Sequence, residues 1–352
     1  MTGYPSADSA PAPHNILLVR TDRIGDVVLS MPAARFIKAR LPQARVSFLT
    51  RAYNAPLAEL APDIDEVLVD PEAGVGGLAR QLAAKRFDAA VLLHPTGRLA
   101  LALWTAGIPV RAGTAYRLYS LLFNRRVRQH RRHSLRHELE HNVDLAAQGL
   151  GLPSAGQPDY PPPRLDIPIG LAAAVTAKVG LNVEGGQRSL IVVHPGSGGS
   201  ARDWPLERFA KLIDALQDEK PEFTVAVTLG PGEEALRGEL EPRLTKKPAW
   251  VTGLDLKELA ALLSRAKLII ANSTGPLHIA TAVGAKALGL YCPMVPCHPK
   301  RWGPYGTGHR ALMPEVELCR KCTGAECRHY DCMEGISLEQ VLSTARDLIG
   351  TS

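Results

Sequence analysis

The residues whose types and order best suit ligand binding lie at 272–276 and have the sequence NSTGP. They fall between an expected strand at 268–270 and an expected helix at 279–283. Hydroxyl residues favour a helix N-cap, and proline is tolerated in the first helical turn. A strand that turns into a helix in this way directs backbone N–H groups and a positive dipole end at the loop, which suits a phosphate. His278 falls in the same first turn. An ordinary capped helix is the alternative.

A long loop of small residues at 194–205, HPGSGGSARDWP, follows an expected strand at 190–193. The hydroxyls of Ser197 and Ser200, together with backbone N–H groups, can cradle a diphosphate, with Arg202 as the counter-charge. The loop matches neither G-x-G-x-x-G nor the Walker pattern, which argues against a standard dinucleotide site or P-loop.

A glycine turn at 230–234 follows the next expected strand, at 223–229. Its acid, Glu233 or the neighbouring Glu234, is placed to bind the ribose hydroxyls or the base of a nucleoside, and an acid at a helix start is the alternative. Three loops suited to phosphate or sugar are therefore expected at one edge of the second sheet.

In the N-terminal half, an apolar strand at 15–20 leads through a loop with two carboxylates into a helix that begins near Val27. Asp26 lies at the N-terminus of that helix, where the helix dipole favours an ionised carboxylate. The sequence alone leaves two interpretations open, a general base and a simple helix cap.

Residues 124–141 form the most basic segment of the chain. Such a cluster can bind phosphates or carboxylates on a nucleic acid, an anionic lipid or an anionic glycan, and a solvated polar face is the alternative. The arginines concerned are Arg125, Arg126, Arg128, Arg131, Arg132 and Arg136.

Strands alternate with helical patterns along the whole chain, which predicts an α/β fold with parallel, doubly wound sheets. A length of 352 residues accommodates two domains, and a proline-rich connector at 160–169 marks the boundary between them. We expect a flexible leader at 1–14, an N-terminal domain at 15–165, a C-terminal domain at 166–335, and a last helix at 336–352.

Charge and hydropathy narrow the class of protein. The formal net charge is +6 and the pI is about 9.0, which suggests an acidic partner. No run of about 18 uncharged apolar residues is present, so we expect no transmembrane helix. The first fifteen residues lack the basic and apolar regions of a secretory signal, which predicts a cytoplasmic protein.

Four cysteines lie close together in a C-x2-C-x4-C-x4-C pattern. A cytoplasmic setting disfavours disulfides, and four thiolates at this spacing suit a structural zinc ion or an iron–sulfur cluster, although the spacing is not that of a standard zinc ribbon. Reduced thiols or bridges are the alternatives. The candidate ligands are Cys319, Cys322, Cys327 and Cys332.

Taken together, the motifs resemble glycosyltransferase family 9, the ADP-heptose:lipopolysaccharide heptosyltransferases. The resemblance rests on five segments in order over residues 16–350: ILLVRTDRIGDVVLSMPAARFIK, HPGSGGSARDWPLERFAKL, LGPGEE, NSTGPLHIATAVG and the cysteine tail. It implies a GT-B architecture, in which two Rossmann-like domains face a central cleft. The N-terminal domain would hold the acceptor and the base, and the C-terminal domain the nucleotide-sugar. The resemblance also implies that the last helix, at 336–352, crosses back to the N-terminal domain.

The resemblance also implies roles for individual residues. Asp26 matches the aspartate of the family's G-D motif and becomes the candidate catalytic base. Many family members carry lysine where this chain has Arg202. Ser273 stands where the best-known heptosyltransferases have an aspartate, so heptose is the expected donor sugar and a hexose stays open. The donor-binding candidates are Ser197, Ser200, Arg202, Glu233, Ser273, Thr274, Gly275 and His278.

The function implied is an inverting transfer of heptose from ADP-heptose to the anionic inner core of lipopolysaccharide in a Gram-negative cell. It requires no cofactor, because no D-x-D motif suited to holding a divalent ion against a diphosphate appears. The six arginines would bind the acceptor, and the protein would contact the cytoplasmic face of the inner membrane. Another nucleotide-sugar or acceptor, or a nucleic-acid-binding protein, is the alternative. A nicotinamide-dependent oxidoreductase is disfavoured by the missing G-x-G-x-x-G, and no nucleic-acid partner is expected.

Overall fold

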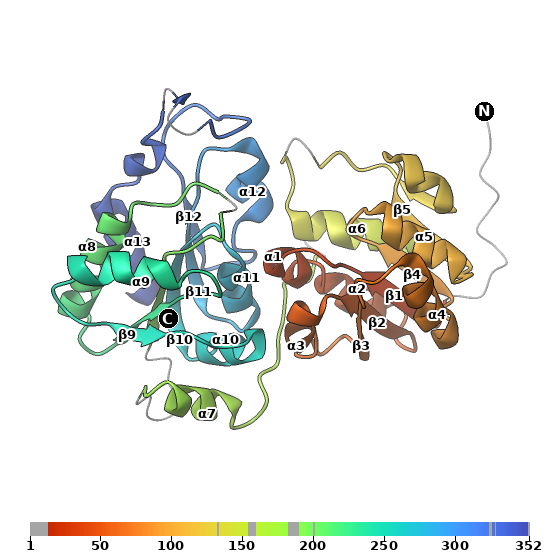
Figure 1. The fold of residues 1–352 in the computed structure, drawn as a ribbon, viewed down its shortest axis with the longest axis horizontal. Helices are drawn as coiled ribbons and strands as arrows, with labels where there is room; N and C mark the ends of the chain where they lie inside the picture. The colour runs from red at the N-terminus through yellow and green to blue at the C-terminus, as the bar shows by residue number, and fades with distance from the viewer. Residues whose placement is uncertain are drawn as a thin grey trace. The chain divides into compact units, whose positions relative to one another are not determined.

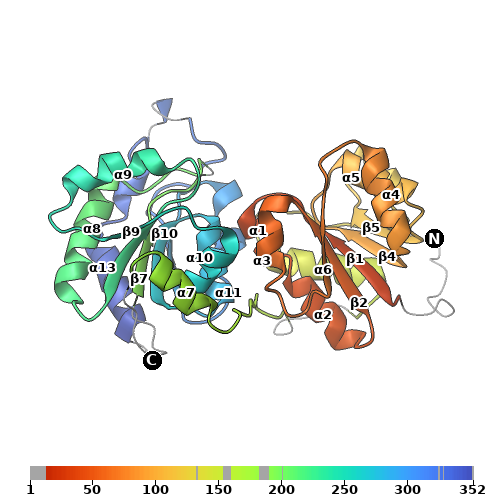
Figure 2. The same cartoon turned by 60° about the horizontal axis from the view of Figure 1, so that its bottom comes forward.

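The computed structural model describes residues 13–131, 134–153, 160–181, 190–199, 201–323, 326–327 and 329–350. The chain forms two compact units (Figures 1 and 2). Unit 1 comprises residues 1–130 and 139–161, and unit 2 comprises residues 131–138 and 162–352. The chain therefore passes between the units at 130/131, at 138/139 and at 161/162, the last within the expected connector.

Unit 1 is built on one six-stranded parallel sheet with the strand order β3-β2-β1-β4-β5-β6. Its strands are β1 (Asn15–Val19), β2 (Arg45–Thr50), β3 (Glu66–Val69), β4 (Ala89–Leu92), β5 (Val110–Thr114) and β6 (Arg125–Val127). The order reverses between β1 and β4, which pair directly. At such a switch point the loops after the two strands diverge and open a ligand-binding crevice at the carboxyl edge of the sheet.

Helices cover both faces of this sheet (Figure 2). Successive side chains of a strand point to opposite faces of the sheet. Leu17 and Val19 of β1 therefore share the face that α4 and α5 cover, where Leu82 and Leu103 complete the core. The helices are α1 (Ile24–Val28), α2 (Pro32–Arg40), α3 (Ala55–Ala58), α4 (Val75–Lys85), α5 (Gly97–Thr105) and α6 (Glu138–Leu150), with 3-10 helices η1 (Ala52–Asn54) and η2 (Leu118–Leu122).

Unit 2 repeats the plan of unit 1, with the order β12-β11-β10-β7-β8-β9. Its parallel strands are β7 (Leu190–His194), β8 (Thr224–Thr228), β9 (Ala249–Val251), β10 (Ala266–Asn272), β11 (Lys286–Leu290) and β12 (Arg310–Leu312). The switch point lies between β7 and β10, so the loops at 195–205 and 273–275 leave the sheet side by side.

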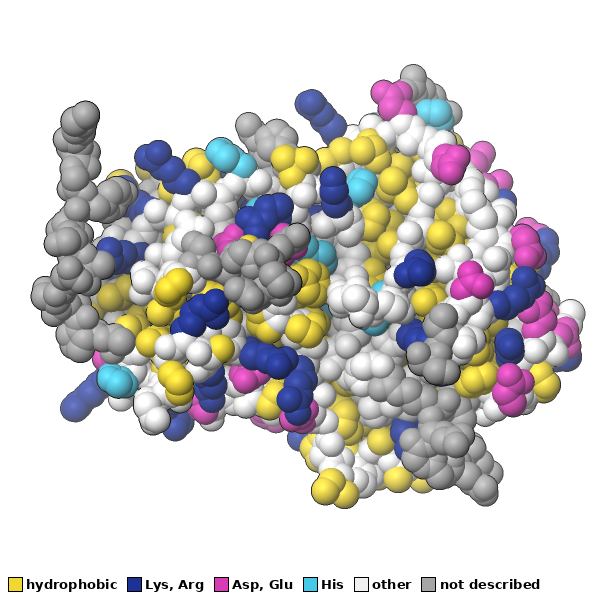
Figure 3. All heavy atoms as spheres, turned by 180° about the vertical axis from the view of Figure 1, so that it is seen from behind, with side chains coloured by type: hydrophobic (Ala, Val, Ile, Leu, Met, Phe, Trp, Pro, Cys, Tyr) yellow, Lys and Arg dark blue, Asp and Glu magenta, His cyan; other side chains and the backbone are white. Residues whose placement is uncertain are grey.

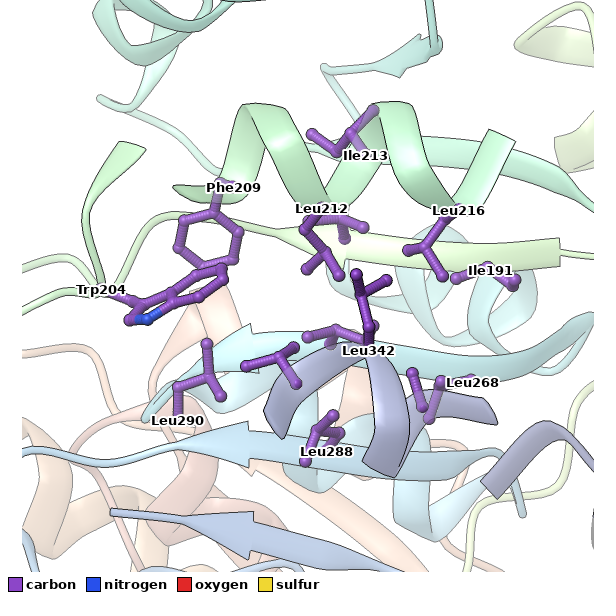
Figure 4. Packing of buried hydrophobic residues seen from close by; sticks show 14 of the residues in the cluster. Ile191, Trp204, Phe209, Leu212, Ile213, Leu216, Leu268, Leu288, Leu290 and Leu342 are labelled. Carbon is purple, nitrogen blue, oxygen red and sulfur yellow. The ribbon is translucent and has the colours of Figure 1, made fainter. Parts of the chain in front are cut away.

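The helices of unit 2 lie on both faces of its sheet, with α8 and α13 on one face and α10 and α11 on the other (Figure 2). Figure 4 shows Trp204, Phe209, Leu212 and Leu342 packed between the sheet and α8 and α13. The helices are α7 (Leu171–Lys178), α8 (Leu206–Glu219), α9 (Glu234–Leu240), α10 (Leu256–Leu263), α11 (Gly275–Ala282), α12 (Pro299–Trp302) and α13 (Leu338–Gly350), with 3-10 helices η3 (Glu241–Arg243), η4 (Val295–Cys297) and η6 (Cys332–Gly335).

The predicted α/β fold with two Rossmann-like parallel sheets is confirmed. Helix α13 belongs to unit 2, where it packs against α8, β10 and β11. Its apolar side, including Val341, Leu342 and Ala345, is buried in the unit 2 core. Among the described helices, none is both long and apolar enough to cross a membrane.

Candidate functional site

The loop after β7 is fastened to the end of β10 by one side chain. Asn272, the last residue of β10 and 1% exposed, accepts a hydrogen bond from the backbone N–H of Trp204 at 3.0 Å and donates one to the carbonyl of Pro195 at 2.6 Å. The indole of Trp204 donates to the carbonyl of Ile336 at 2.9 Å and lies edge-on to Phe209, which anchors the loop in the core. Both ends of the loop are therefore fixed beside the start of α11.

The glycine turn after β8 folds its acid back onto this loop. The Glu233 carboxylate accepts a hydrogen bond from the backbone N–H of Gly230 at 2.7 Å and lies 3.4 Å from Nε2 of His194, whose Nδ1 is 3.0 Å from the Thr228 hydroxyl. A Cβ at Gly196 would lie 2.0 Å from Glu233 Oε1, so any larger residue there would displace the Glu233 carboxylate. Burial lowers the pKa of His194, with the Glu233 charge opposing, so the ring is neutral.

The start of α11 has the form expected of an anion site. Thr274 is its N-cap residue in an extended conformation, its hydroxyl makes no capping hydrogen bond, and the helix opens with Gly275 and a proline. His278 is buried, and its Nδ1 has no hydrogen-bond partner among the described residues. Burial, and then the nearby His137, lowers the pKa of His278 to about 3. A neutral imidazole and a helix N-terminus therefore meet next to Ser273 without competing side-chain caps.

The remaining predicted donor residues are placed unevenly. Ser197 is buried in the loop, while Ser200 lies outside the described residues. Burial raises the pKa of the nearby Asp203 to about 6, although a hydrogen bond from Ser197 opposes the rise, and the Glu233 charge adds to it. Sequence reasoning assigned no role to Asp203, His194 or Asn272. The contacts of His194 with Thr228 and of Asn272 with Trp204 join segments far apart in sequence.

Arg202 points toward the cysteine tail in this structure. Its guanidinium carbon lies 4.0 Å from the centre of the Tyr330 ring. Burial lowers the pKa of Arg202, but hydrogen bonds with Tyr330 and Cys322 outweigh this and raise it overall, so the side chain stays cationic. Arg202, the predicted counter-charge to the diphosphate, is thus stacked on the Tyr330 ring, near the end of the loop at 194–205.

In unit 1, the loop after β1 carries a compact charged cluster at the other switch point. Arg20 forms ion pairs with Asp26 and, at 2.6 Å, with Asp22, and Asp22 lies 2.8 Å from Nδ1 of His94. Burial raises the pKa of Asp22, but Arg20 and His94 together outweigh it and lower the pKa to about 2. Asp26, the predicted base, is in the first turn of α1 and its side chain is 16% exposed.

A second layer of hydrogen bonds fixes this cluster. Asn142 of α6 accepts from Nη1 of Arg20 at 3.3 Å and donates to the carbonyl of Leu29 and the hydroxyl of Ser30, at 3.1 and 3.0 Å. The Ser30 hydroxyl in turn donates to the carbonyl of Asp26 at 2.7 Å. Arg20 and Asn142 lie 122 residues apart, and no local pattern connects them, so the sequence analysis did not find this network.

The structure divides the basic segment between the two units. Arg125, Arg126 and Arg128 are exposed on and after β6 in unit 1. Arg131 belongs to unit 2 and pairs at 2.5 Å with the buried Glu138, which also pairs with Arg301 at 2.9 Å. Arg136 also lies in the unit 2 part of the segment, and Arg132 falls outside the described residues. The six predicted acceptor arginines therefore do not form one continuous surface.

The cysteine tail lines a small cavity that also receives a cysteine from the sheet. All four predicted ligands line it, and they are joined by Cys292, which follows β11, and by His329. A hydrogen bond from Cys297 lowers the pKa of Cys292 to about 6; burial opposes this, and the backbone N–H of Arg202 contributes. In the described part of the chain, no group of three or more His, Cys, Asp and Glu side chains is placed to hold a metal ion.

Comparison with known proteins decides the family. Residues 75–332 match the model of glycosyltransferase family 9 (heptosyltransferase). The chain belongs to glycosyltransferase family 9. Over 298 residues it is 31% identical to a Haemophilus influenzae protein named only as a glycosyltransferase, with 82% of this chain and 85% of the relative covered.

Two further comparisons place this family 9 glycosyltransferase among heptosyltransferases. It is 29% identical to lipopolysaccharide heptosyltransferase 2 of Escherichia coli over 301 residues, which cover 80% of this chain and 83% of the relative. The solved structure of E. coli ADP-heptose lps heptosyltransferase II superposes with a TM-score of 0.79 at 24% identity, covering 95% and 98% of the two chains, which confirms the GT-B type of fold. The chain is a glycosyltransferase of the heptosyltransferase family.

Proposed function

We propose that this glycosyltransferase transfers heptose from ADP-heptose to an anionic inner-core acceptor of lipopolysaccharide, with inversion at the anomeric carbon. The observation that carries the proposal is the switch point of unit 2. There, the open N-terminus of α11 and the unpartnered Nδ1 of the buried His278 lie beside the small-residue loop that Asn272 holds. Backbone N–H groups at a helix N-terminus favour a diphosphate.

The donor would bind to unit 2 with its diphosphate at Thr274 and Gly275. Glu233, fixed on the Gly230 turn, would serve the nucleoside, and Arg202 would neutralise the departing diphosphate. Stabilisation at the point where charge develops contributes strongly to catalysis. Ser273 would contact the sugar in place of an aspartate, and for this reason a donor with another sugar is the second candidate.

Asp26 would act as the general base. It would take the proton from the acceptor hydroxyl, whose oxygen attacks C1 of the sugar opposite the diphosphate while the C1–O bond breaks and ADP leaves. Arg20 holds the Asp26 carboxylate in one orientation, and Asn142 holds Arg20. The cluster thus has a charge pair to orient the base and a histidine, His94, at its edge.

No step of this mechanism uses a metal ion. The D-x-D spacing in the chain, Asp63 and Asp65, precedes β3 at the edge of the sheet opposite to the switch point. Asp65 is bound there to Lys38 at 2.6 Å and to the backbone N–H of Val46 at 2.7 Å. For the cysteine tail we propose a structural role; metal analysis of protein purified without chelator tests whether zinc or an iron–sulfur cluster is present.

We further propose a cytoplasmic location with peripheral contact to the inner membrane, where a lipopolysaccharide precursor is anchored. Exposed arginines on β6 fit the phosphates and carboxylates of such an acceptor. Binding of nucleic acid is the rejected alternative, because it gives no role to the Asp26 cluster or to the start of α11.

Calorimetric titration with ADP, UDP, GDP and NAD in EDTA tests the donor. We expect selective binding of ADP, weakened about tenfold or more by Arg202→Ala, because a charge-assisted bond to phosphate is lost. Lys211→Ala, which removes an exposed charge from α8, is the control and leaves the affinity unchanged. Preference for UDP or GDP would show that the donor is not an ADP-sugar, and absence of nucleotide binding would refute the proposed function.

A further inference from the structure

The 3-10 helix η2 in unit 1 carries two leucines on its outer side. Leu118 is 89% exposed and Leu121 is 73% exposed. A 3-10 helix has three residues per turn, so residues three apart lie on one face. Leu118 and Leu121 therefore share one face, and Tyr119 and Leu122 share another, which packs on the core of α4 and α5.

The inner side of η2 is firmly held. The Tyr119 hydroxyl donates to the carbonyl of Pro95, and its ring would lie 3.3 Å from a Cβ at Gly97 of α5. The buried Ser120 hydroxyl donates to the carbonyl of Thr114 at 2.5 Å and accepts from the backbone N–H of Arg117 at 3.1 Å. The two leucines cannot turn inward without breaking these contacts, so their exposure is built into the fold.

Helix α5, which contacts η2, repeats the arrangement. Its buried residues include Leu99 and Leu103, whereas Leu101 and Trp104, three apart, are 38% and 53% exposed. Two neighbouring elements thus each turn a pair of large apolar side chains to solvent. Surface leucines that occur singly need no explanation, but grouped apolar side chains mark a binding surface.

The chain segment that carries these side chains has charge of one sign. From Ala89 to His130 the chain contains no Asp or Glu and six arginines. Of these, Arg98 pairs with Asp70, and Arg111 binds backbone carbonyls. The others are exposed and form no ion pair with any carboxylate among the described residues: Arg117, Arg125, Arg126 and Arg128. Figure 3 shows one face of the molecule, on which Lys and Arg lie among hydrophobic side chains and scattered Asp and Glu.

We infer that η2, the outer side of α5 and the β6 arginines form a docking surface for an anionic lipid bilayer. Leucines and a tryptophan held outward suit the boundary of the acyl chains, and arginines without acidic partners suit lipid phosphates. A second copy of the chain fits less well, because it would bring the same unpaired arginines together. This docking surface would make the peripheral membrane contact proposed above. It rests on the proposed function only for which membrane supplies the lipid.

Co-sedimentation with vesicles tests the surface in the absence of donor and acceptor. The probes are vesicles of 30% phosphatidylglycerol in phosphatidylcholine and vesicles of phosphatidylcholine alone. We expect the full-length protein to bind the first and not the second, and the double variant Leu118→Ser, Leu121→Ser to lose at least tenfold in partition. Ile169→Ser is the matched control, because Ile169 is fully exposed on the connector and lies outside the surface.

Two further measurements separate the possible failures. ADP binding, and transfer to a deacylated, water-soluble acceptor, should be equal in the double variant and the wild type, which keeps this test independent of the proposed reaction. Equal vesicle partition of the double variant and the wild type would overturn the surface. So would equal binding to both kinds of vesicle, or a dimer in sedimentation analysis that the leucine substitutions dissociate.

Discussion

At the scale of single residues, the two switch points differ in how their charges are arranged. In unit 1, Arg20 lies between two carboxylates and its side chain is only 4% exposed. The positive charge of Arg20 is therefore compensated within the cluster. In unit 2, the start of α11 has a cationic dipole end and a neutral His278, with the anion to be supplied by the ligand. The first arrangement suits proton transfer, and the second suits diphosphate binding.

Replacement of Asp26 by asparagine keeps the shape of the side chain and removes its basicity. We expect kcat to fall by about 10²- to 10⁴-fold, the usual contribution of a general base. The affinity for ADP should not change, because the residues proposed to bind the donor belong to unit 2. Steady-state transfer assays with calorimetry on the same sample check both. Asp63→Asn, at the opposite edge of the sheet, is the control, and an Asp26→Asn enzyme of normal kcat would exclude this base.

The Asp22 carboxylate gives a pH-dependent contribution to stability. Its pKa is lowered to about 2 in the folded protein, against about 3.8 for an unperturbed group. A lowered folded-state pKa stabilises the fold above pH 4, and the stabilisation disappears as the pH falls from about 4 to 2. Asp22→Asn should therefore cost about 2 kcal/mol of unfolding free energy at pH 7 and about half of that at pH 3.

Urea unfolding of wild type and Asp22→Asn at both pH values measures this difference. A difference between the two proteins that stays constant between pH 7 and pH 3 would show that the ion pairs with Arg20 and His94 do not lower the pKa of Asp22. Asp65→Asn is a useful comparison, because its carboxylate pairs with Lys38 at the other edge of the same sheet.

At the scale of elements, the loop at 195–205 and the turn at 230–233 act as one piece, because Glu233 occupies the space beside Gly196. Gly196→Ala should push the Glu233 carboxylate off the Gly230 turn and lower ADP affinity about tenfold, with little effect on overall stability. Gly238→Ala, in α9 with open space around it, is the control. Calorimetric ADP titration of the two variants measures the effect, and equal affinities would show that Glu233 does not bind the donor.

The secondary-structure elements also differ in how well they could be predicted from the sequence. The strand–loop–helix signals around β7, β10 and β1 predicted the architecture and the loops that meet at the switch points, because buried apolar runs and turn residues are local features. The short strands β5, β6 and β12 were not predicted: at three to five residues they carry little pattern of their own. Arg20–Asn142 and Asn272–Trp204 depend on contacts between distant segments, which a single sequence does not display.

At the scale of the whole molecule, the basic segment serves more than one purpose. Arg131 stabilises unit 2 through Glu138, whereas the arginines on β6 remain exposed. Reversal of Arg125, Arg126 and Arg128 to glutamate should raise the KM for a deacylated acceptor about tenfold or more, since several exposed ion pairs are replaced by repulsion. ADP binding should be unaffected. Arg80→Glu on α4 is the control, and an unchanged acceptor KM would remove these residues from acceptor binding.

The path of the chain has a consequence for synthesis on the ribosome. Residues 131–138 leave unit 1 to join unit 2, where Ser134 binds the carbonyl of Val295 and His137 that of Gly303. These partners are translated more than 150 residues later. The nascent chain must therefore finish unit 1 around α6 while holding an eight-residue segment without its final contacts. Neither unit can be produced as one continuous fragment, and separating them requires cuts at 130/131, 138/139 and 161/162 or a permuted chain.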